Sequence, residues 1–328
     1  MARNPIPRRA ALYDNTRLTD YKTCPRKFYF LHERNWRPDI VRLPLVFGEA
    51  WHSAMDAIWR SAPAAISDDE CTANGFKEFQ RIWTERGALV ADPLETGRRS
   101  EPRTPDTALE MLFHYVKERR AFLRNIELLA VEQPFAVPLK EDKSLFYVGV
   151  LDKVFKHEGR IYIGEHKTTS MYRKNGPFAD TFLESFSPNS QIGGYLYAGK
   201  VLYGADLKAV WIDAALVHME VHDAFRWIPV EVAFEQIDAW LWEAHQWIEW
   251  ASSEKATLRR SRVKRAKRLY HDADPYMACY PRNTKSCIDF NTTCAFLDIC
   301  KTCSNPDALE APPLSFKIEP WNPLDRVD

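Results

Sequence analysis

The sequence lacks several features that would assign a protein to a class at once. Lys and Arg number 45, as do Asp and Glu, so the net charge is zero and no overall basicity indicates a nucleic-acid partner. No apolar run approaches the roughly 20 residues of a membrane span, and Met1–Arg9 lacks the apolar core of a signal peptide. A nucleic-acid partner would need a local basic patch, and we expect a soluble cytoplasmic protein with no membrane partner.

The chain also contains no internal repeat, no low-complexity tract and no helicase motif, so any unwinding partner would be a separate chain. At 328 residues it is long enough for one elaborated domain or two. Helical and strand patterns follow one another in mixed order, which predicts an α/β (α+β) fold with a small mixed sheet flanked by helices. We expect a single domain over residues 1–328, with a helical or loop insertion at residues 61–106.

Apolar periodicity gives the expected elements. The expected helices are Thr16–Arg34, with Asn15 or Thr16 as its N-cap, Gly48–Arg60, Thr107–Leu128, Ser187–Tyr203 and Phe234–Ala251. The expected strands are Ala130–Leu139, Phe146–Phe155, Ile161–Lys167, Ala209–Met219 and Phe225–Val232. Ser67–Pro105 is polar and shows only a short helical pattern.

The most informative stretch is the predicted hairpin within Phe146–Lys167. Glu158 and Gly159 can form its loop, because Gly159 supplies the positive φ that a tight turn needs. With a two-residue loop, the register sets Asp152 opposite Glu165, and their Cβ atoms would lie roughly 4.5–5.5 Å apart. Two carboxylates are thereby expected to face each other across neighbouring strands.

These two acids lie in an aliphatic surface. Because side chains alternate between the two faces of a strand, the face that carries these acids also carries Val148, Val150, Val154, Ile161 and Ile163. Like charges that face each other in a desolvated sheet destabilise it unless a cation lies between them. Oxygen ligands without nearby thiolates suit Mg²⁺ or Mn²⁺. The alternative is a pair of ordinary surface acids, one of them paired to Lys153 or Lys167.

The cysteines suggest a second metal site, since seven cysteines in an intracellular chain favour a metal over a disulfide. Four of them crowd into residues 287–303 of the polar, cysteine-rich segment 279–305, whereas Cys24 stands far away, before Pro25. Metal binding would stabilise this segment, because its free energy becomes folding free energy. Spacing alone does not separate Zn²⁺ from an iron–sulfur cluster, and scattered free thiols are the alternative. The four are Cys287, Cys294, Cys300 and Cys303.

Four motifs occur in a specific order along the chain. They are Gly48…His52, Gly149-Val150-Leu151-Asp152, Glu165-His166-Lys167 and Gln191…Tyr195. Together with cysteines on both sides, this order resembles the PD-(D/E)XK nuclease superfamily. The nearest likeness is to the RecB and AddB nuclease domains, the CRISPR-associated adaptation nucleases and their phage-encoded relatives. The resemblance implies a restriction-endonuclease-like core and hydrolysis of phosphodiester bonds.

The resemblance implies a role for each motif residue. Asp152 and Glu165 would bind Mg²⁺ or Mn²⁺, with the backbone carbonyl of His166 and a ring nitrogen of His52 as further ligands. Lys167 would orient or deprotonate the attacking water and stabilise the charge that develops on phosphorus. The implied catalytic set is therefore Asp152, Glu165 and Lys167, while the alternative for His52 is a packed core histidine.

Two further groups are candidates for DNA contact. Gln191 and Tyr195 lie four residues apart, so they share one helix face; they would contact Lys167 or the DNA backbone, or form an ordinary half-buried pair. The run Lys255–Arg268 holds eight Lys or Arg. It would contact DNA phosphates and release their counterions on binding, and the alternative is a solvated helix face. Its candidates for phosphate contact are Arg259, Arg260 and Lys264.

The resemblance also implies a 4Fe–4S cluster that clamps the N-terminal and C-terminal segments together. Carried over position by position, the implied ligands are Cys24, Cys287, Cys294 and Cys300. The third ligand is Cys287 or Cys303, because six residues, rather than the family's two, separate Cys287 from Cys294. Zn²⁺ is the alternative occupant.

The sequence thus predicts a metal-dependent DNA nuclease, an exonuclease acting at DNA ends or in single strands, in recombination, repair or phage DNA processing. The expected partners are DNA and a separate helicase or recombinase. The alternatives are a nucleic-acid-binding protein or a zinc-stabilised adaptor module without turnover. The intact set of Asp152, Glu165 and Lys167 argues against the first alternative, and metal analysis would separate the second.

Overall fold

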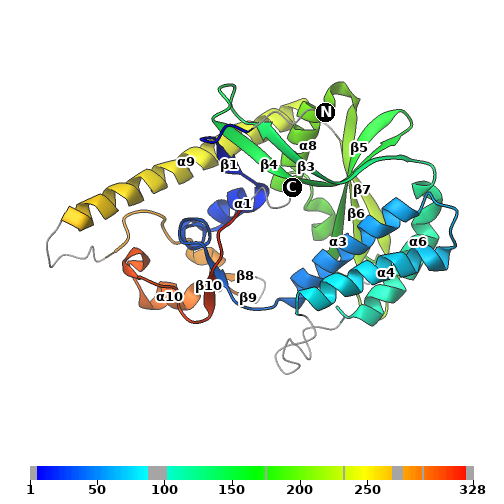
Figure 1. Ribbon diagram of the computed structural model, residues 1–328, viewed down its shortest axis with the longest axis horizontal. Helices are drawn as coiled ribbons and strands as arrows, with labels where there is room; N and C mark the ends of the chain where they lie inside the picture. The colour runs from blue at the N-terminus through cyan, green and yellow to red at the C-terminus, as the bar shows by residue number, and fades with distance from the viewer. Residues whose placement is uncertain are drawn as a thin grey trace. The chain divides into compact units, whose positions relative to one another are not determined.

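The computed structural model describes residues 6–87, 102–173, 176–231, 233–267, 276–289 and 292–322, without the side chains of residues 265–267 (Figure 1). The chain divides into two compact units. Unit 1 comprises Met1–Ile40, Ala136–Gly149 and Asp238–Asp328, and unit 2 comprises Val41–Phe135 and Val150–Ile237. The expectation of one domain over residues 1–328 stays a prediction.

Unit 2 is built on a mixed sheet. Its strands are β3 (Glu127–Pro138), β4 (Leu145–His157), β5 (Arg160–Thr169), β6 (Leu207–Leu216) and β7 (Phe225–Glu231). β3 pairs with β4, β4 and β5 are antiparallel, β5 and β6 are parallel, and β6 and β7 are antiparallel. All five predicted strands are therefore present, with ends shifted by a few residues.

The hairpin of β4 and β5 has the predicted register. Glu158 and Gly159 have φ angles of 48° and 78°, the positive values that a two-residue type I′ turn requires. The strand pairing runs up to Lys153 opposite Gly164. The next step of this register places Asp152 opposite the second predicted acid, as the sequence indicates.

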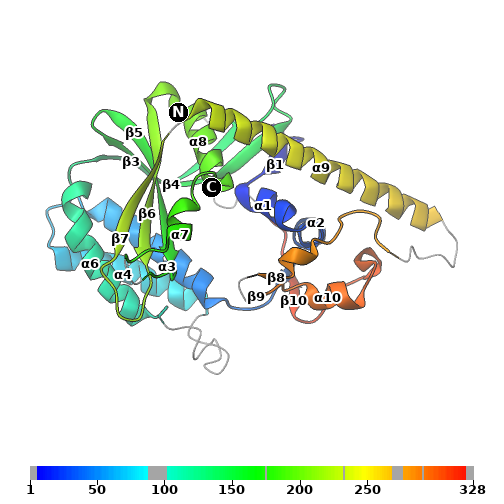
Figure 2. The ribbon, with the colours of Figure 1, turned by 180° about the vertical axis from the view of Figure 1, so that it is seen from behind.

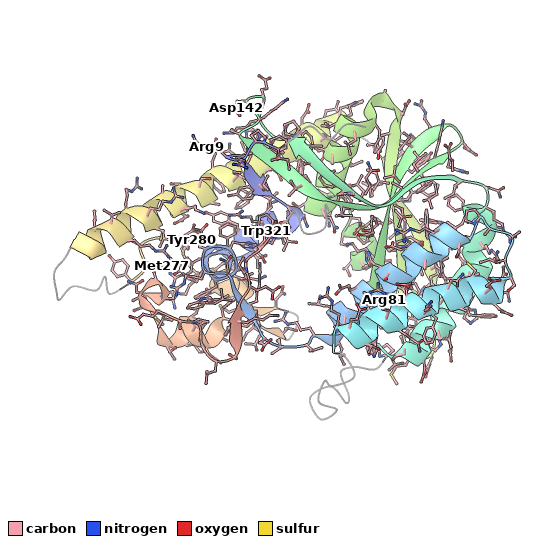
Figure 3. All side chains as sticks on the ribbon, in the orientation of Figure 1. Arg9, Arg81, Asp142, Met277, Tyr280 and Trp321 are labelled. Carbon is pink, nitrogen blue, oxygen red and sulfur yellow. The ribbon has the colours of Figure 1, made fainter. Side chains whose placement is uncertain are left out.

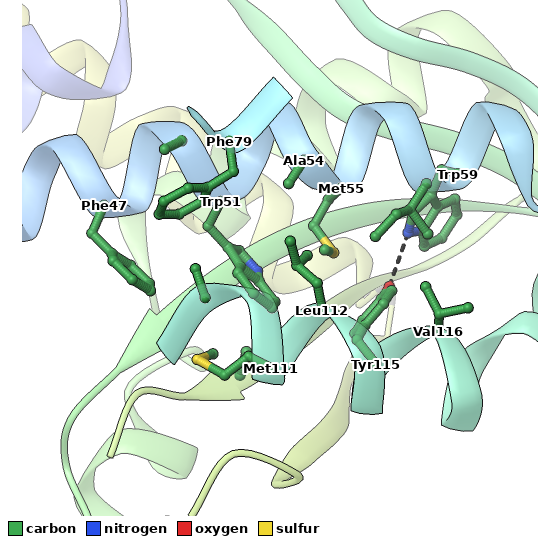
Figure 4. Close-up of a cluster of buried hydrophobic side chains, with 14 of the residues drawn as sticks. Phe47, Trp51, Ala54, Met55, Trp59, Phe79, Met111, Leu112, Tyr115 and Val116 are labelled. Carbon is green, nitrogen blue, oxygen red and sulfur yellow. Dashed lines mark hydrogen bonds between the residues drawn. The ribbon is translucent and has the colours of Figure 1, made fainter. Parts of the chain in front are cut away.

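Three helices cover one face of the unit 2 sheet: α3 (Leu43–Ser61), α4 (Asp68–Glu85) and α6 (Pro105–Leu123). Their apolar faces meet in one cluster (Figure 4), in which the Trp59 indole donates a hydrogen bond of 3.0 Å to the Tyr115 hydroxyl. Phe155 of β4 and Tyr162 of β5 also belong to this cluster. The helices therefore fix the strands that carry the predicted acids.

Helix α4 corrects the prediction of a short helical patch. It spans 18 residues and buries Cys71, Phe79 and Trp83 in the same cluster. The composition of Ser67–Pro105 did not indicate a helix of this length, because most of the α4 surface is solvated and its polar residues dominate the composition of the segment. Residues 88–101 lie outside the described residues, and the insertion at 61–106 stays a prediction.

Helix α8 (Ser190–Tyr203) covers the opposite face of the sheet (Figure 2). It packs so closely that a Cβ on Gly199 would lie 2.7 Å from the Ile163 side chain and 2.9 Å from that of Leu207. Glycine at this position lets α8 approach β5 closely. The short helices α7 (Asp180–Glu184) and η3 (Gly204–Asp206) flank α8 in the β5–β6 connection.

Unit 1 brings together segments from both ends of the chain. Its strand pairs are β1 (Ala11–Tyr13) with the first residues of β4, β2 (Trp36–Pro38) with β10 (Phe316–Ile318), and β8 (Ile288–Asp289) with β9 (Thr292–Thr293). Its helices are α1 (Asn15–Thr23), α2 (Pro25–Phe28), η1 (Tyr29–Glu33), α9 (Phe234–Lys267, whose first turn belongs to unit 2), η4 (Thr284–Ser286), α10 (Leu297–Thr302) and η5 (Pro306–Ala308). An aromatic cluster that includes Tyr280, labelled in Figure 3, packs these pieces together.

The predicted helix Thr16–Arg34 is wrong in its continuity. Cys24 is extended (φ −163°, ψ 114°) and separates α1 from α2, because Pro25 disfavours a helical residue before it. The N-cap is Asp14, whose Oδ1 accepts the Arg17 N–H at 2.7 Å, rather than either predicted residue. Across the described ranges, no helix is both long enough and apolar enough to cross a membrane.

Candidate active site

Asp152 lies on β4, beside the helix α3 that carries His52. Its Oδ2 is 3.0 Å from His52 Nδ1 and accepts the backbone N–H of His166 at 3.1 Å. Burial alone would raise the pKa of Asp152, but the charges of His52 and Lys153 and the His52 hydrogen bond hold this pKa well below its ordinary value. Asp152 is therefore a buried, ionised carboxylate.

Glu165 is the second acid, on β5, and it is 1% exposed. Its Oε1 accepts hydrogen bonds from the Lys167 ammonium and, at 3.0 Å, from Gln191 Nε2. Burial, and next the charge of Asp152, raise the pKa of Glu165, although Lys167 opposes this. Its Oε2 is buried and has no hydrogen-bond partner among the described residues, so one oxygen of this carboxylate is left to bind something else.

The two acids are not ordinary surface residues, since both are buried. The alternative reading also expected one of the acids to pair with Lys153 or Lys167, and Lys167 does pair with Glu165. Lys153, by contrast, is fully buried and pairs with Asp56 of α3. Asp152 is thus paired with His52 and Glu165 with Lys167, while Lys153 has Asp56 as its partner.

Helix α8 supplies a side chain that ties the catalytic candidates together. The Gln191 Oε1 accepts a hydrogen bond of 2.9 Å from Lys167 Nζ, and its Nε2 group also donates to the Tyr195 hydroxyl at 3.1 Å. The Tyr195 hydroxyl donates in turn to the Val150 carbonyl at 3.0 Å. Gln191 contacts Lys167, as one alternative predicted; contact of Gln191 or the buried Tyr195 with DNA stays a prediction.

The protonation of His52 follows from its neighbours. Burial lowers the pKa of His52, but the charges of Asp152 and Glu165 outweigh it, so the pKa is raised. The two carboxylates therefore favour the protonated ring, which pairs with Asp152. Because a histidine that binds a metal must be neutral, a cation and a proton would compete for this ring.

The donor set fits a hard divalent cation. Two buried carboxylates repel each other, and one buried carboxylate oxygen, Glu165 Oε2, is unpaired, which is what a missing positive charge predicts. Within the described ranges, no three His, Cys, Asp or Glu side chains already form a group that could hold a metal ion. Lys167 and His52 now neutralise the carboxylates, and a cation would replace part of those contacts.

The His166 ring lies apart from the two carboxylates. It is buried, and burial sets its pKa well below the ordinary value, so it is neutral. Its Nδ1 is 3.5 Å from Asp213 Oδ2, and the Tyr115 hydroxyl donates to the same oxygen at 2.5 Å. The ring therefore packs against a buried polar group, while its predicted backbone-carbonyl ligand stays a prediction.

Glu132, on β3, is a functional candidate that sequence reasoning missed. Burial and the charges of Asp152 and Asp56 raise the pKa of Glu132 to about 7, and its φ is 51°. A non-glycine residue with positive φ costs free energy and often marks a functional site. The only sequence signal was an acid within an otherwise apolar strand pattern.

Glu132→Gln should raise stability above pH 7. The raised pKa of Glu132 means that the folded state holds its proton up to about pH 7, whereas the unfolded state loses it near pH 4.5. The neutral form thus stabilises the fold at low pH, and this is lost as pH rises through about 7. Glu132 is more than a third exposed, so solvent reduces the effect; we expect the melting temperature of the variant to exceed that of the wild type by about 2–4 °C at pH 8. An equal difference at pH 4.5 and pH 8 would contradict this.

Unit 1 brings Cys24 to the cysteine-rich segment. The Asn283 backbone N–H donates to Cys24 Sγ at 3.3 Å, and the Asn283 side chain donates to the Thr23 carbonyl at 2.8 Å. Burial and the charges of Cys24 and Cys294 raise the pKa of Cys300 to about 11, although Arg26 opposes this, so these three thiols are electrostatic neighbours. The segment is also closed on itself, since the Cys294 N–H donates to the Cys287 carbonyl at 2.9 Å.

A buried arginine fits an anionic group at these thiols. Arg26 is 4% exposed, and its Nε donates to the Tyr280 carbonyl at 2.8 Å. Its Nη1 is buried without a hydrogen-bond partner in the described part of the chain, and its electrostatic neighbours include Cys24 and Cys300. Thiolates bound to a metal centre would supply the missing acceptor. Cys71, in contrast, packs in unit 2.

The basic run lies in the second half of α9. Two of its members have acidic partners, since Lys255 is 2.9 Å from Glu33 and Arg262 is 2.6 Å from Asp307. The three predicted DNA contacts, Arg259, Arg260 and Lys264, are exposed. The side chains of residues 265–268 lie outside the described residues. The run is thus partly structural, with an exposed remainder.

Comparison with known proteins gives one sequence match over most of the chain. The profile of the PD-(D/E)XK nuclease superfamily matches residues 15–301. The comparison with curated proteins gives no match. Among solved structures, one from Eubacterium rectale, described as a "putative exonuclease", is 11% identical, with 79% of this chain and 89% of that chain covered and a TM-score of 0.43.

Proposed function

The chain belongs to the PD-(D/E)XK nuclease superfamily, and from this we propose that it is a Mg²⁺- or Mn²⁺-dependent deoxyribonuclease. The reaction is hydrolysis of phosphodiester bonds, as an exonuclease at DNA ends or in single strands. The observation that carries the proposal is the set of Asp152, Glu165, Lys167 and Gln191, in which two buried carboxylates and an ammonium from β4 and β5 meet an amide from α8.

The metal would be held by Asp152, Glu165 and His52, with the His166 carbonyl as a further ligand. When bound, it would lower the pKa of its water and stabilise negative charge on the phosphate. The buried acids exclude bulk water, which strengthens each charge interaction around the scissile bond. Because a proton and the metal would compete for the His52 ring, this affinity would increase with pH.

Lys167 is better suited to charge stabilisation than to proton abstraction. Burial lowers its pKa, but the charge of Glu165 outweighs burial and raises the pKa above the ordinary value. The side chain therefore stays an ammonium at neutral pH and can orient the water and stabilise the developing phosphorane charge. Gln191 holds this ammonium beside Glu165 by bonding both groups.

Digestion of end-labelled single-stranded and double-stranded DNA with Mg²⁺ or Mn²⁺ tests the proposal. Exonuclease action predicts progressive loss of the end label as mononucleotides or short oligonucleotides, while a circular single strand resists. Binding of DNA without turnover would instead support a nucleic-acid-binding or adaptor protein. We place the activity in recombination, repair or phage DNA processing, in the cytoplasm of a bacterial or phage-infected cell, with a separate helicase or recombinase as partner.

We further propose that the cysteines hold a 4Fe–4S cluster. The neighbouring thiols of Cys24, Cys294 and Cys300 and the unpaired buried Nη1 of Arg26 support it. The remaining ligand would be Cys287 or Cys303. By tying residues near both ends of the chain, the cluster would stabilise unit 1 in the way that a structural metal does.

Anaerobic purification should yield a brown protein with about four iron and four sulfide per chain. Cys24→Ser should lose most of the iron, whereas Cys71→Ala, with its thiol in unit 2, should retain it. Comparing Cys287→Ser with Cys303→Ser identifies the remaining ligand by iron content. A colourless protein that carries only zinc would remove the cluster and support the zinc-stabilised alternative.

The exposed basic side chains of α9 are proposed to follow the DNA backbone. Replacing Arg259, Arg260 and Lys264 together by Gln should weaken single-strand binding and reduce the slope of log affinity against log salt by about 2, since each phosphate contact contributes about 0.7. The control is Lys255→Gln, because Lys255 is paired with Glu33. An unchanged slope in the triple variant would limit α9 to a structural role.

A further inference from the structure

We propose that Tyr172, His218 and Arg103 form a subsite that binds the nucleotide next to the scissile phosphate. This inference rests on the proposed nuclease function, and it adds a contact that the proposed function itself does not require. All three residues belong to unit 2. Tyr172 and His218 would stack on the base, and Arg103 would bind the adjoining phosphate.

The stacking surface comes from two loops at one edge of the sheet. Tyr172 follows β5 and His218 follows β6, and these strands are parallel neighbours, so their carboxyl ends lie side by side. The two rings stack at 4.5 Å between centroids with 30° between planes. Tyr172 keeps 43% of its surface exposed, so the outer part of the stack is open to a further flat ring.

The orientation of the His218 ring is fixed by a backbone hydrogen bond. Its Nδ1 accepts the backbone N–H of Glu220 at 3.2 Å. A stacked aromatic pair can bind bases of any sequence, because every base has a π face. Met171 and Met219, which are next to Tyr172 and His218 in the sequence, are also exposed, at 42% and 62%.

Arg103 supplies the charge. It donates to the Ser170 hydroxyl at 3.2 Å, and burial lowers its pKa. No salt bridge to an acidic side chain is found for it in the described part of the chain. A half-buried guanidinium with free N–H groups is suited to a phosphate.

The subsite has the right position for a neighbouring nucleotide. Ser170 lies three residues beyond Lys167 along the chain, or roughly 10 Å at about 3.3 Å per residue. The loops are held in place: the Val217 N–H bonds the Thr169 carbonyl at 2.7 Å, and the Ala179 N–H bonds the Met171 carbonyl at 2.9 Å. A buried apolar cluster that includes Phe178 packs beneath them. The platform is therefore attached to the strand that carries the catalytic candidates.

The test compares Tyr172→Ala with Phe113→Ala, which removes an equally exposed aromatic ring (45%) from α6. Affinity for a fluorescent single-stranded oligonucleotide is measured with Ca²⁺ in place of Mg²⁺. We expect Tyr172→Ala to weaken binding about tenfold, Tyr172→Phe to retain most of the affinity, and Phe113→Ala to match the wild type. Arg103→Gln should weaken binding and lower its salt dependence, and Arg81→Gln, from an exposed ion pair, should not.

Cleavage of oligonucleotides with one abasic site moved along the chain locates the base. In the wild type, one position beside the cleaved bond should slow cleavage about tenfold, and in Tyr172→Ala the same abasic site should have no additional effect. Wild-type affinity in Tyr172→Ala, or an abasic effect that persists in it, would overturn the subsite and point to a protein partner for this surface. If the wild type cleaves no DNA, the proposed function fails, while the binding comparison still decides the subsite.

Discussion

Replacing Asp152 by Asn should reduce metal-dependent DNA hydrolysis by about 10³-fold or more. The substitution keeps the side-chain volume but removes one of the two negative charges that face each other across β4 and β5. Without it, the proposed cation would lose a ligand, and the water and phosphate would lose the charge stabilisation that the cation supplies. Turnover of end-labelled DNA under Mg²⁺ and Mn²⁺ measures the effect.

The matched control is Glu158→Gln, which removes an exposed acid from the turn of the same hairpin. It should retain wild-type turnover. A second readout separates the electrostatic effect from loss of fold: Asp152 is the main cause of the raised pKa of His52, so nuclear magnetic resonance should find that pKa lowered in Asp152→Asn. Hydrolysis that survives the substitution would mean that the active site lies elsewhere or that a contaminant is responsible.

The second large effect concerns stability rather than turnover. Asp56→Ala should lower the free energy of unfolding by about 3–5 kcal/mol, because it leaves Lys153 as a fully buried ammonium without its carboxylate. The double change of Asp56→Leu with Lys153→Met should recover most of the loss, since two apolar groups then replace the pair. Urea unfolding of the three proteins gives the comparison.

Glu85→Ala is the control for the pair, because Glu85 forms an exposed ion pair with Arg81 on α4. Exposed pairs contribute about 0.3–0.5 kcal/mol. A loss below about 1 kcal/mol in Asp56→Ala would show that solvent reaches Lys153 and that the pair is not buried in solution.

The sequence predicted the hairpin well because its information is local. Alternating apolar residues and a two-residue loop with Gly159 determine both the face and the register of each side chain. Those two facts were enough to bring Asp152 and Glu165 together and to place Lys167 beside them. The four-residue spacing of Gln191 and Tyr195 likewise predicted their shared face on α8.

Features set by distant parts of the chain could not be predicted in this way. The partner of Lys153 is Asp56, 97 residues away, and no local pattern pairs them. Glu132 reaches the site only because β3 pairs with β4. The break in the first helix followed from Pro25, a local signal that the apolar periodicity around it obscured.

Binding of Mn²⁺ in the absence of DNA tests the central claim most directly. Calorimetric titration of the purified protein should find a Mn²⁺ site that Asp152→Asn and Glu165→Gln each weaken by at least about tenfold, and that Lys167→Met retains. The same Mn²⁺ affinity in wild type, Asp152→Asn and Glu165→Gln would contradict the claim that the two facing carboxylates share a divalent cation.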